Sequence, residues 1–151
     1  DESFDLVFSK EAFLHIPDKE ELLKDVHRIL KPGGLIVVSD WMRMDDNPPS
    51  KQMQGYIDAE GLEMLMCSLE KYKELLQETN FTDIQIKDRN DWYLKKAKKE
   101  LEDIEGPLYQ KVLDVLGLEE TIGAIDIWKK LIGVLEIGEH RPGHFRAKKL
   151  G

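Results

Sequence analysis

The sequence lacks several features that would define a functional class of protein. Cys67 is its single cysteine, which excludes an internal disulfide and a multi-cysteine metal site and favours a reducing, cytoplasmic environment. No apolar run approaches the roughly 18 residues that span a bilayer, and no basic leader precedes an apolar segment. With 22 Lys and Arg against 30 Asp and Glu, the net charge is −8, so nucleic acids and anionic membranes are poor partners.

A phosphate-binding glycine motif is also missing, but a regular order of elements is present. No G-x-G-x-x-G pattern occurs, and Gly33 and Gly34 follow a helix rather than a strand, which is typical of a turn. A chain of 151 residues with 41% hydrophobic residues is long enough for one domain with a sizeable core. Apolar spacing predicts strands at 4–8, 35–38, 81–87 and 143–149 and helices at 17–31, 51–60, 68–78, 91–106, 108–115 and 118–136.

This alternation favours an α/β sheet covered by helices. The continuous apolar runs at 4–8 and 35–38 are typical of parallel strands that are buried on both faces. Ligands of such sheets bind beyond the carboxyl ends of the strands. The segments Ser9–Glu11 and Ser39–Trp41 directly follow these two runs, so they are the first candidates for a binding site. The proline-containing loop at 41–50 is a candidate lid.

One segment carries a specific family resemblance. The sequence FDLVFSKEAFLHIPDKEELLKDVHRILKPGGLIVVSD, from Phe4 to Asp40, resembles the second half of class I S-adenosylmethionine-dependent methyltransferases. The DRND sequence at Asp88–Asp91 and the HFRAKK sequence near the end resemble phosphoethanolamine N-methyltransferases. The SKEAFLHIPDK segment and the stretch Leu62–Leu76 are similar to sarcosine/dimethylglycine N-methyltransferases. Two departures from the phosphobase pattern are the absence of histidine at 41–50 and a leucine at position 62.

The resemblance implies a fold and a domain organisation. We expect an α/β fold, the C-terminal half of a Rossmann-like methyltransferase sheet, mostly parallel with an antiparallel last strand and with added helices. Residues 1–151 would form one partial methyltransferase domain whose N-terminal cofactor-binding half is absent, and residues 90–138 a helical insertion on the substrate side. The outer edge of strand 4–8 would then be exposed, so we expect a longer gene product, a homodimer or a pairing chain to cover it.

The resemblance also implies an activity and a cofactor. S-adenosylmethionine would donate a methyl group to the nitrogen of a small amine that bears an anionic group, such as phosphoethanolamine or sarcosine/dimethylglycine, and no metal is required. The chain alone is expected to be inactive. The alternative from another class is a non-catalytic binding or scaffold subunit that pairs with a separate cofactor-binding chain.

Each candidate side chain also has a structural interpretation. Asp40 would attract the amine or accept its proton, or else cap a loop, and His15 would act as a base, or else bond only to backbone. Arg89 would bind the anionic group, or else pair with a neighbouring aspartate. Aromatic rings would surround a methylated ammonium, or else fill the core. The predicted cofactor contacts are Phe8, Ser9, Lys10 and Glu11, the catalytic residues Asp40 and His15, and the substrate contacts Arg89, Tyr93, Tyr56, Trp41 and Arg146.

Overall fold

The computed structural model describes residues 1–151, which divide into two compact units. The first, unit 1, comprises residues 1–47, 63–89 and 141–151 and contains the sheet. Its elements are β1 (Phe4–Lys10), a 3₁₀ turn η1 (Phe13–His15), α1 (Lys19–Ile29), β2 (Leu30–Asp40), α3 (Leu69–Glu78), β3 (Phe81–Asp88) and β4 (Gly143–Lys149). Unit 2 comprises residues 48–62 and 90–140 and contains α2 (Lys51–Glu60), α4 (Asn90–Glu105), α5 (Tyr109–Leu116) and α6 (Leu118–Glu136).

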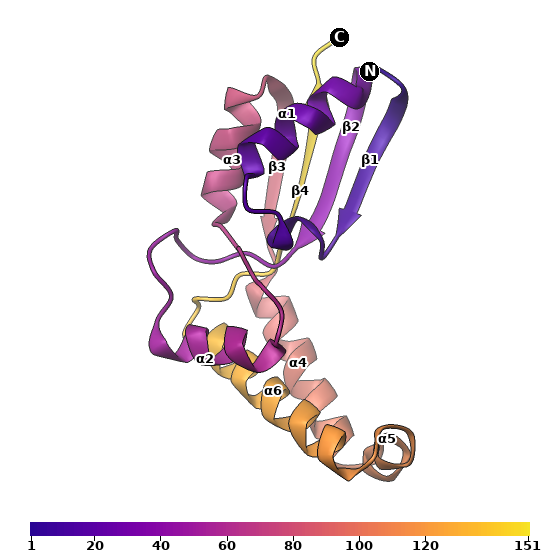
Figure 1. Ribbon diagram of the computed structural model, residues 1–151, viewed down its shortest axis with the longest axis vertical. Coiled ribbons are helices and arrows are strands. Elements are labelled where there is room, and N and C mark those ends of the chain that lie inside the picture. Colours follow the sequence, from indigo (N-terminus) through magenta and orange to yellow (C-terminus); the bar gives the residue numbers. More distant parts are fainter. The chain divides into compact units, whose positions relative to one another are not determined.

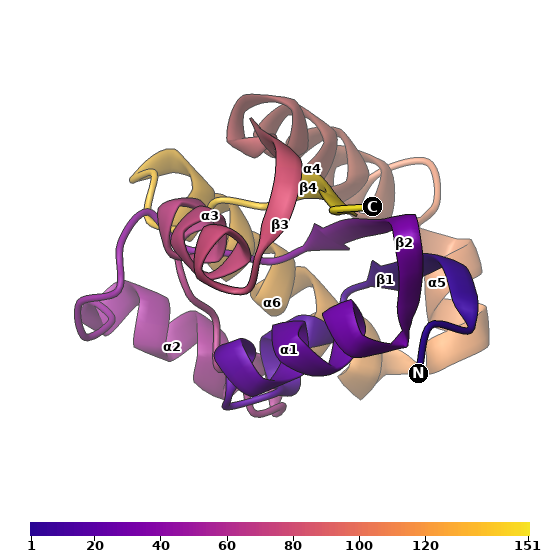
Figure 2. The ribbon, with the colours of Figure 1, turned by 90° about the horizontal axis from the view of Figure 1, so that it is seen from above.

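The sheet confirms the predicted fold class. Its strand order is β1-β2-β4-β3, with β1 parallel to β2 and β4 antiparallel to both of its neighbours (Figure 1). Strands β1, β2 and β3 therefore run in one direction and β4, the last in sequence, runs in the other. Both long α-helices of unit 1, α1 and α3, lie on the same side of the sheet (Figure 2). Within unit 1, these helices therefore cover one face of the sheet, whereas the sequence predicted strands that are covered on both faces.

Two boundaries differ from the prediction for local reasons. The first helix starts at Lys19 rather than at Pro17, because the carboxylate of Asp18 accepts a hydrogen bond from the Glu21 amide at 2.9 Å and so caps the helix. The Pro-Gly-Gly segment lies inside β2 rather than before it. The register with β1 jumps there, from Phe4 opposite Leu30 to Leu6 opposite Leu35, so the predicted turn takes the form of an irregularity within a longer strand.

The core of unit 1 lies between the sheet and the two helices. Leu23 of α1 and Leu76 of α3 are fully buried, as are Ile36 of β2 and Phe145 of β4. The Tyr72 ring packs against that of Phe145, with 4.8 Å between the centroids. These contacts hold α1 and α3 against one face of the sheet. The loops at the carboxyl ends of β1 and β2 begin at strands that belong to this core.

Unit 2 is a helical assembly with its own core. Helix α6 packs against α2, α4 and α5, and Leu131, Val134 and Leu135 of α6 are buried. The side-chain amide of Asn90 donates to the carbonyl oxygens of Leu135 (3.0 Å) and His140 (2.7 Å), which ties the start of α4 to the end of α6. The predicted 90–138 insertion thus lies in a unit that also contains α2. No helix of the chain is both long enough and apolar enough to cross a membrane.

We predict that Leu23→Ala lowers the free energy of unfolding by about 2–5 kcal/mol, because it removes buried methyl groups and leaves a cavity under α1. Leu150→Ala, at a leucine that is 67% exposed, is the matched control and should change stability by less than about 0.5 kcal/mol. Urea unfolding followed by circular dichroism measures both values. Equal effects of the two substitutions would contradict this assignment of the core.

Candidate functional site

Strand register brings three strand ends to one edge of the sheet. Ser9 lies opposite Val38 and Lys10 opposite Ser39, and the Glu11 amide continues the pairing by donating to the Ser39 carbonyl at 2.9 Å. Asp40 of β2 and Asp88 of β3 both lie opposite Gly143 of β4. The carboxyl ends of β1, β2 and β3 therefore meet at this edge, which we call the carboxyl edge. Ser9, Asp40 and Arg89 lie at the carboxyl edge. The sequence predicted this position for Ser9 and Asp40.

The four predicted cofactor contacts point in different directions. Ser9 is buried and lies on the helix-covered face, since its neighbour across the pairing, Val38, is a core residue. Phe8 and Lys10 lie on the opposite face and are exposed. Glu11 has a φ of 51°, a left-handed backbone conformation that residues other than glycine adopt only at a cost. Strain of this kind at a strand end is common where a loop has a function.

Asp40 is buried at this edge and bonds to two backbone amides. Its Oδ2 accepts from the Leu14 amide at 3.0 Å and its Oδ1 from the Trp41 amide at 2.8 Å, and only 2% of the residue is exposed. Burial raises the pKa of the Asp40 carboxyl above its usual value, while these backbone hydrogen bonds and the charge of Lys19 oppose the rise. The carboxyl group therefore anchors the loop after β1, and its orientation is fixed by both oxygens.

The loop after β1 is held by a second chain segment, residues 63–66. The Leu65 amide donates to the Leu14 carbonyl at 2.8 Å, and the Lys19 ammonium donates to the carbonyl oxygens of Leu65 (2.9 Å) and Ile16. Lys19 is 7% exposed, and desolvation by burial lowers the pKa of its amine. Sequence reasoning missed Lys19, because a lysine in the first turn of a helix normally points into solvent.

His15 lies beside this network. Its Nδ1 is 2.6 Å from the carbonyl oxygen of Glu63, and the residue is exposed. A ring nitrogen that bonds to a carbonyl oxygen must carry the proton, so in the neutral imidazole Nε2 is the acceptor. His15 therefore makes the backbone contact that we gave as its structural interpretation. Its other ring nitrogen, Nε2, is the one that a ligand could contact.

The end of β3 contributes positive charge to the carboxyl edge. The backbone amide of Arg89 donates to the Pro142 carbonyl at 2.8 Å. The Asp88 carboxylate pairs with Arg141, whose Nε is 3.3 Å from Oδ2. Arg141 was not among the predicted residues, although its position two residues before β4 places it at the same edge. Desolvation and the nearby cations Arg89 and Lys87 lower the pKa of His144.

The remaining predicted residues lie elsewhere. Arg146 lies opposite Val37 and Gln85, within the sheet rather than at the carboxyl edge, and its guanidinium is 3.7 Å from the Asp83 carboxylate. Trp41 follows Asp40 directly and is half-buried. Tyr56 and Tyr93 belong to unit 2, where the buried Tyr56 ring lies 5.6 Å from that of His140 and the Tyr93 ring lies 6.1 Å from that of Trp92.

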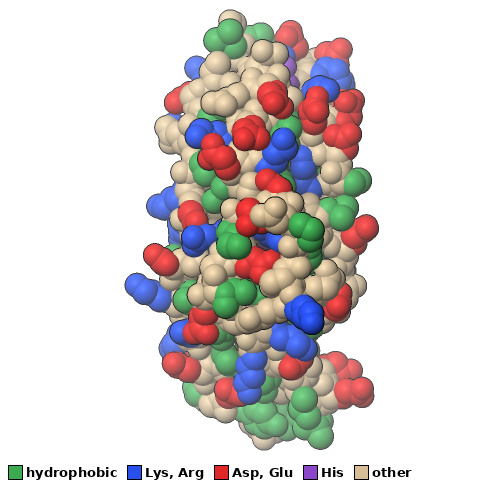
Figure 3. All heavy atoms as spheres, turned by 90° about the vertical axis from the view of Figure 1, so that its left-hand side faces the viewer, with side chains coloured by type: hydrophobic (Ala, Val, Ile, Leu, Met, Phe, Trp, Pro, Cys, Tyr) green, Lys and Arg blue, Asp and Glu red, His purple; other side chains and the backbone are tan.

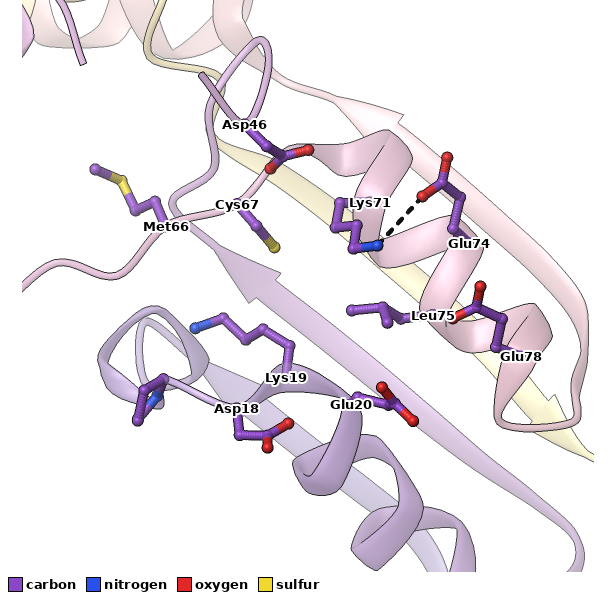
Figure 4. Close-up of a pocket in the computed structure, with 11 residues that line it drawn as sticks. Asp18, Lys19, Glu20, Asp46, Met66, Cys67, Lys71, Glu74, Leu75 and Glu78 are labelled. Carbon is purple, nitrogen blue, oxygen red and sulfur yellow. Dashed lines mark ion pairs between the residues drawn. The ribbon is translucent and has the colours of Figure 1, made fainter. Parts of the chain in front are cut away.

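A separate cleft of about 840 Å³ lies between the start of α1 and α3 (Figure 4). Cys67 lines it, and burial raises the pKa of this thiol to about 12, so the thiol is protonated and unreactive at neutral pH. Several charged groups of the wall bond to other protein groups. Lys71 pairs with Glu74 at 3.5 Å, and Asp18 caps α1. The cleft therefore contains no activated nucleophile.

Comparison with known proteins gives one family match and several long relatives. Residues 1–38 match the family model described as "Methyltransferase domain". A phosphoethanolamine N-methyltransferase of Triticum aestivum is 32% identical over 149 residues, which are 99% of this chain and 29% of the wheat protein. A sarcosine/dimethylglycine N-methyltransferase of Halorhodospira halochloris is 31% identical over 128 residues, which are 83% of this chain and 45% of that protein. The chain thus spans less than half of the length of either relative.

Solved structures agree with these relatives. Phosphoethanolamine N-methyltransferase 2 of Haemonchus contortus, solved with phosphomonomethylethanolamine and S-adenosylhomocysteine, matches with a TM-score of 0.88 at 25% identity, over 99% of this chain and 34% of that chain. A putative sarcosine dimethylglycine methyltransferase of Galdieria sulphuraria matches with a TM-score of 0.82 at 25% identity, over 99% and 54% of the two chains. The similarity therefore extends over both units, well beyond the residues of the family match.

We predict that Asp40→Asn changes the pH dependence of stability. A carboxyl group whose pKa is raised by folding stabilises the protein below its unfolded-state pKa, and this stabilisation is lost as the pH rises through its folded-state pKa. Asparagine does not titrate, so the stability of Asp40→Asn relative to the wild type should improve as the pH rises from acid to neutral. Urea unfolding across this range measures the difference. Asp58→Asn, at an exposed aspartate of α2, is the control, and a difference for Asp40→Asn that does not vary with pH would contradict the prediction.

Proposed function

We propose that the chain belongs to the methyltransferase family, whose model residues 1–38 match, and that it takes part in S-adenosylmethionine-dependent N-methylation of a small amine. Its similarity to the Haemonchus contortus structure supports this proposal. The observation that carries the proposal is that Ser9, Asp40 and Arg89 all lie at the carboxyl edge of the sheet. The Haemonchus contortus relative was solved with a methylated phosphoethanolamine and with S-adenosylhomocysteine, which supports both the donor and the substrate class.

Methyl transfer from a sulfonium is an in-line displacement that needs an aligned, unprotonated amine more than it needs covalent help from the protein. S-adenosylmethionine would supply the electrophilic methyl group. The exposed side chains of Phe8, Lys10 and Glu11 surround the end of β1, and an ammonium and a carboxylate there suit the zwitterionic methionine part of the donor. The side chain of Ser9 is buried, so we assign Ser9 a contact with the donor through its backbone.

On the substrate side, we assign Arg89 to the anionic group and His15 to the amine. A guanidinium binds phosphate or carboxylate through two parallel hydrogen bonds, so Arg89 suits both phosphoethanolamine and sarcosine. Nε2 of His15 is the acceptor that would take the proton of the amine. Asp40 acts through the backbone of the loop after β1, because both of its oxygens already accept hydrogen bonds. Trp41, which follows Asp40 directly, remains a proposed substrate contact. Tyr56 and Tyr93 belong to unit 2 and Arg146 lies within the sheet, so we leave these three predicted contacts out of the proposed site.

A non-catalytic subunit is the second candidate, and one observation favours it. The outer edge of β1 pairs with no strand of this chain, so its main-chain groups are available to a strand of another polypeptide or of a longer gene product. Titration calorimetry with S-adenosylmethionine on the protein expressed from its natural gene separates the two candidates. Heat of binding by the protein favours the enzyme, and its absence with retained folding favours the subunit.

The direct test is a methyl-transfer assay on the protein expressed from its natural gene, with S-adenosylmethionine and with phosphoethanolamine or sarcosine in turn. We predict that Arg89→Gln raises the KM for the accepted amine about 10- to 100-fold, since a charge-assisted hydrogen bond contributes about 1.5–3 kcal/mol. Arg28→Gln, at an exposed arginine that pairs with Asp25, is the matched control and should leave KM unchanged. Turnover of neither amine would refute the proposed activity, and an unchanged KM for Arg89→Gln would refute the role of Arg89 alone.

A further inference from the structure

Lys19, the first residue of α1, lies in a position that is unfavourable for a lysine. On the face shown in Figure 3, lysine and arginine side chains lie at the surface among carboxylates, as charged side chains normally do. Lys19 instead is 7% exposed. The positive end of the helix dipole repels a cation at this position, and burial of a charge is unfavourable as well. The contacts that offset both effects therefore indicate what this lysine does.

The buried ammonium of Lys19 connects two segments of the chain. Its side chain extends from α1 toward the segment that carries Cys67 (Figure 4). Nζ donates to the carbonyl oxygen of Leu65 at 2.9 Å and to that of Ile16. Ile16 belongs to the loop after β1, whereas Leu65 belongs to residues 63–66. One cation thus fastens these two segments to each other.

Both segments determine how His15 is held. Ile16 directly follows His15 in the loop after β1. Glu63, two residues before Leu65, has its carbonyl oxygen 2.6 Å from Nδ1 of His15. Because Nδ1 must carry the proton in that hydrogen bond, the neutral ring keeps Nε2 as an acceptor. Lys19 is therefore connected to His15 through the backbone on both sides of this bond.

We propose that Lys19 is a positioning residue for methyl transfer, because it holds the Glu63 carbonyl where this group fixes the orientation and tautomer of His15. The inference rests on the proposed function. In that function, Nε2 of His15 takes a proton from the amine, the nitrogen lone pair bonds to the methyl carbon, and the carbon–sulfur bond breaks with its electron pair going to sulfur. Without Lys19, the ring is free to rotate and to carry its proton on Nε2, which then accepts none.

The kinetic test uses the protein expressed from its natural gene. Lys19→Met keeps an unbranched side chain and removes the donors. We expect it to lower kcat about 10- to 100-fold, part of the roughly 10²–10⁴-fold that a general base contributes. The KM for the amine should change by less than about twofold, because the substrate anion is assigned to Arg89. Lys24→Met, at an exposed lysine of α1 that pairs with Glu20, is the matched control and should leave kcat unchanged.

Equal losses of kcat in Lys19→Met and Lys24→Met, or a higher KM with an unchanged kcat, overturn the proposal. If Lys19→Met does not fold, as urea unfolding would show, Lys19→Gln takes its place. Glutamine keeps amide donors on a shorter side chain, and the same direction of change is expected.

A double-mutant cycle separates positioning from a purely structural role. A structural lysine would lower kcat whether or not His15 is present. In a His15→Ala background, Lys19→Met should instead lower kcat by less than about twofold further, because a positioning residue acts through the group that it positions. A further loss as large as in the wild-type background overturns the proposal.

Nitrogen-15 NMR of His15 at alkaline pH, where the imidazole is neutral, gives a readout that is independent of turnover. The wild type should show the tautomer with the proton on Nδ1, and Lys19→Met a mixture of both tautomers. The same single tautomer in both proteins overturns the role of Lys19. If the wild type turns over neither amine, the proposed function fails, and the NMR comparison still decides whether Lys19 holds His15.

Discussion

The parallel pairing of β1 with β2 is the constraint on which the proposed site depends. Parallel strands place their carboxyl ends at one edge, and the buried carboxyl group of Asp40 then fastens the loop after β1 to the end of β2 through the Leu14 amide. The network continues from the Leu14 carbonyl to Leu65 and from Leu65 to Lys19. The end of β2, the loop after β1 and residues 63–66 are thereby held together. The backbone groups of Leu14 and Leu65 and the side chains of Asp40 and Lys19 make these bonds.

Much of the fold could be predicted because its signals are local. The apolar run at 35–38, the helical spacing at 118–136 and the strand pattern at 143–149 each indicate an element from a few neighbouring residues. Asn80, two residues after the end of α3, has a φ of 62°, the left-handed conformation that asparagine often adopts after a helix. The predicted meeting of Ser9 with Asp40 followed from a general property of parallel sheets rather than from these residues themselves.

The residues that could not be predicted depend on tertiary contacts. Lys19 is buried because residues 63–66 cross over it, and nothing in the first turn of α1 indicates that crossing. Arg141 reaches the carboxyl edge because β4 lies between β2 and β3, an order that the sequence does not reveal. The placement of Arg146 inside the sheet depends on the same order. Tyr56 and Tyr93 illustrate a further difficulty, since α2 joins α4 and α6 in a unit that is discontinuous in the chain.

The left-handed backbone at Glu11 has a consequence for ligand binding. A residue with a β-carbon holds this conformation only when its surroundings favour it, and here the Glu11 amide donates a hydrogen bond to the Ser39 carbonyl at 2.9 Å. The conformational entropy of the Glu11 backbone is therefore lost during folding. A small molecule that binds at the end of β1 meets a preorganised backbone, and its affinity is not reduced by the need to order that segment.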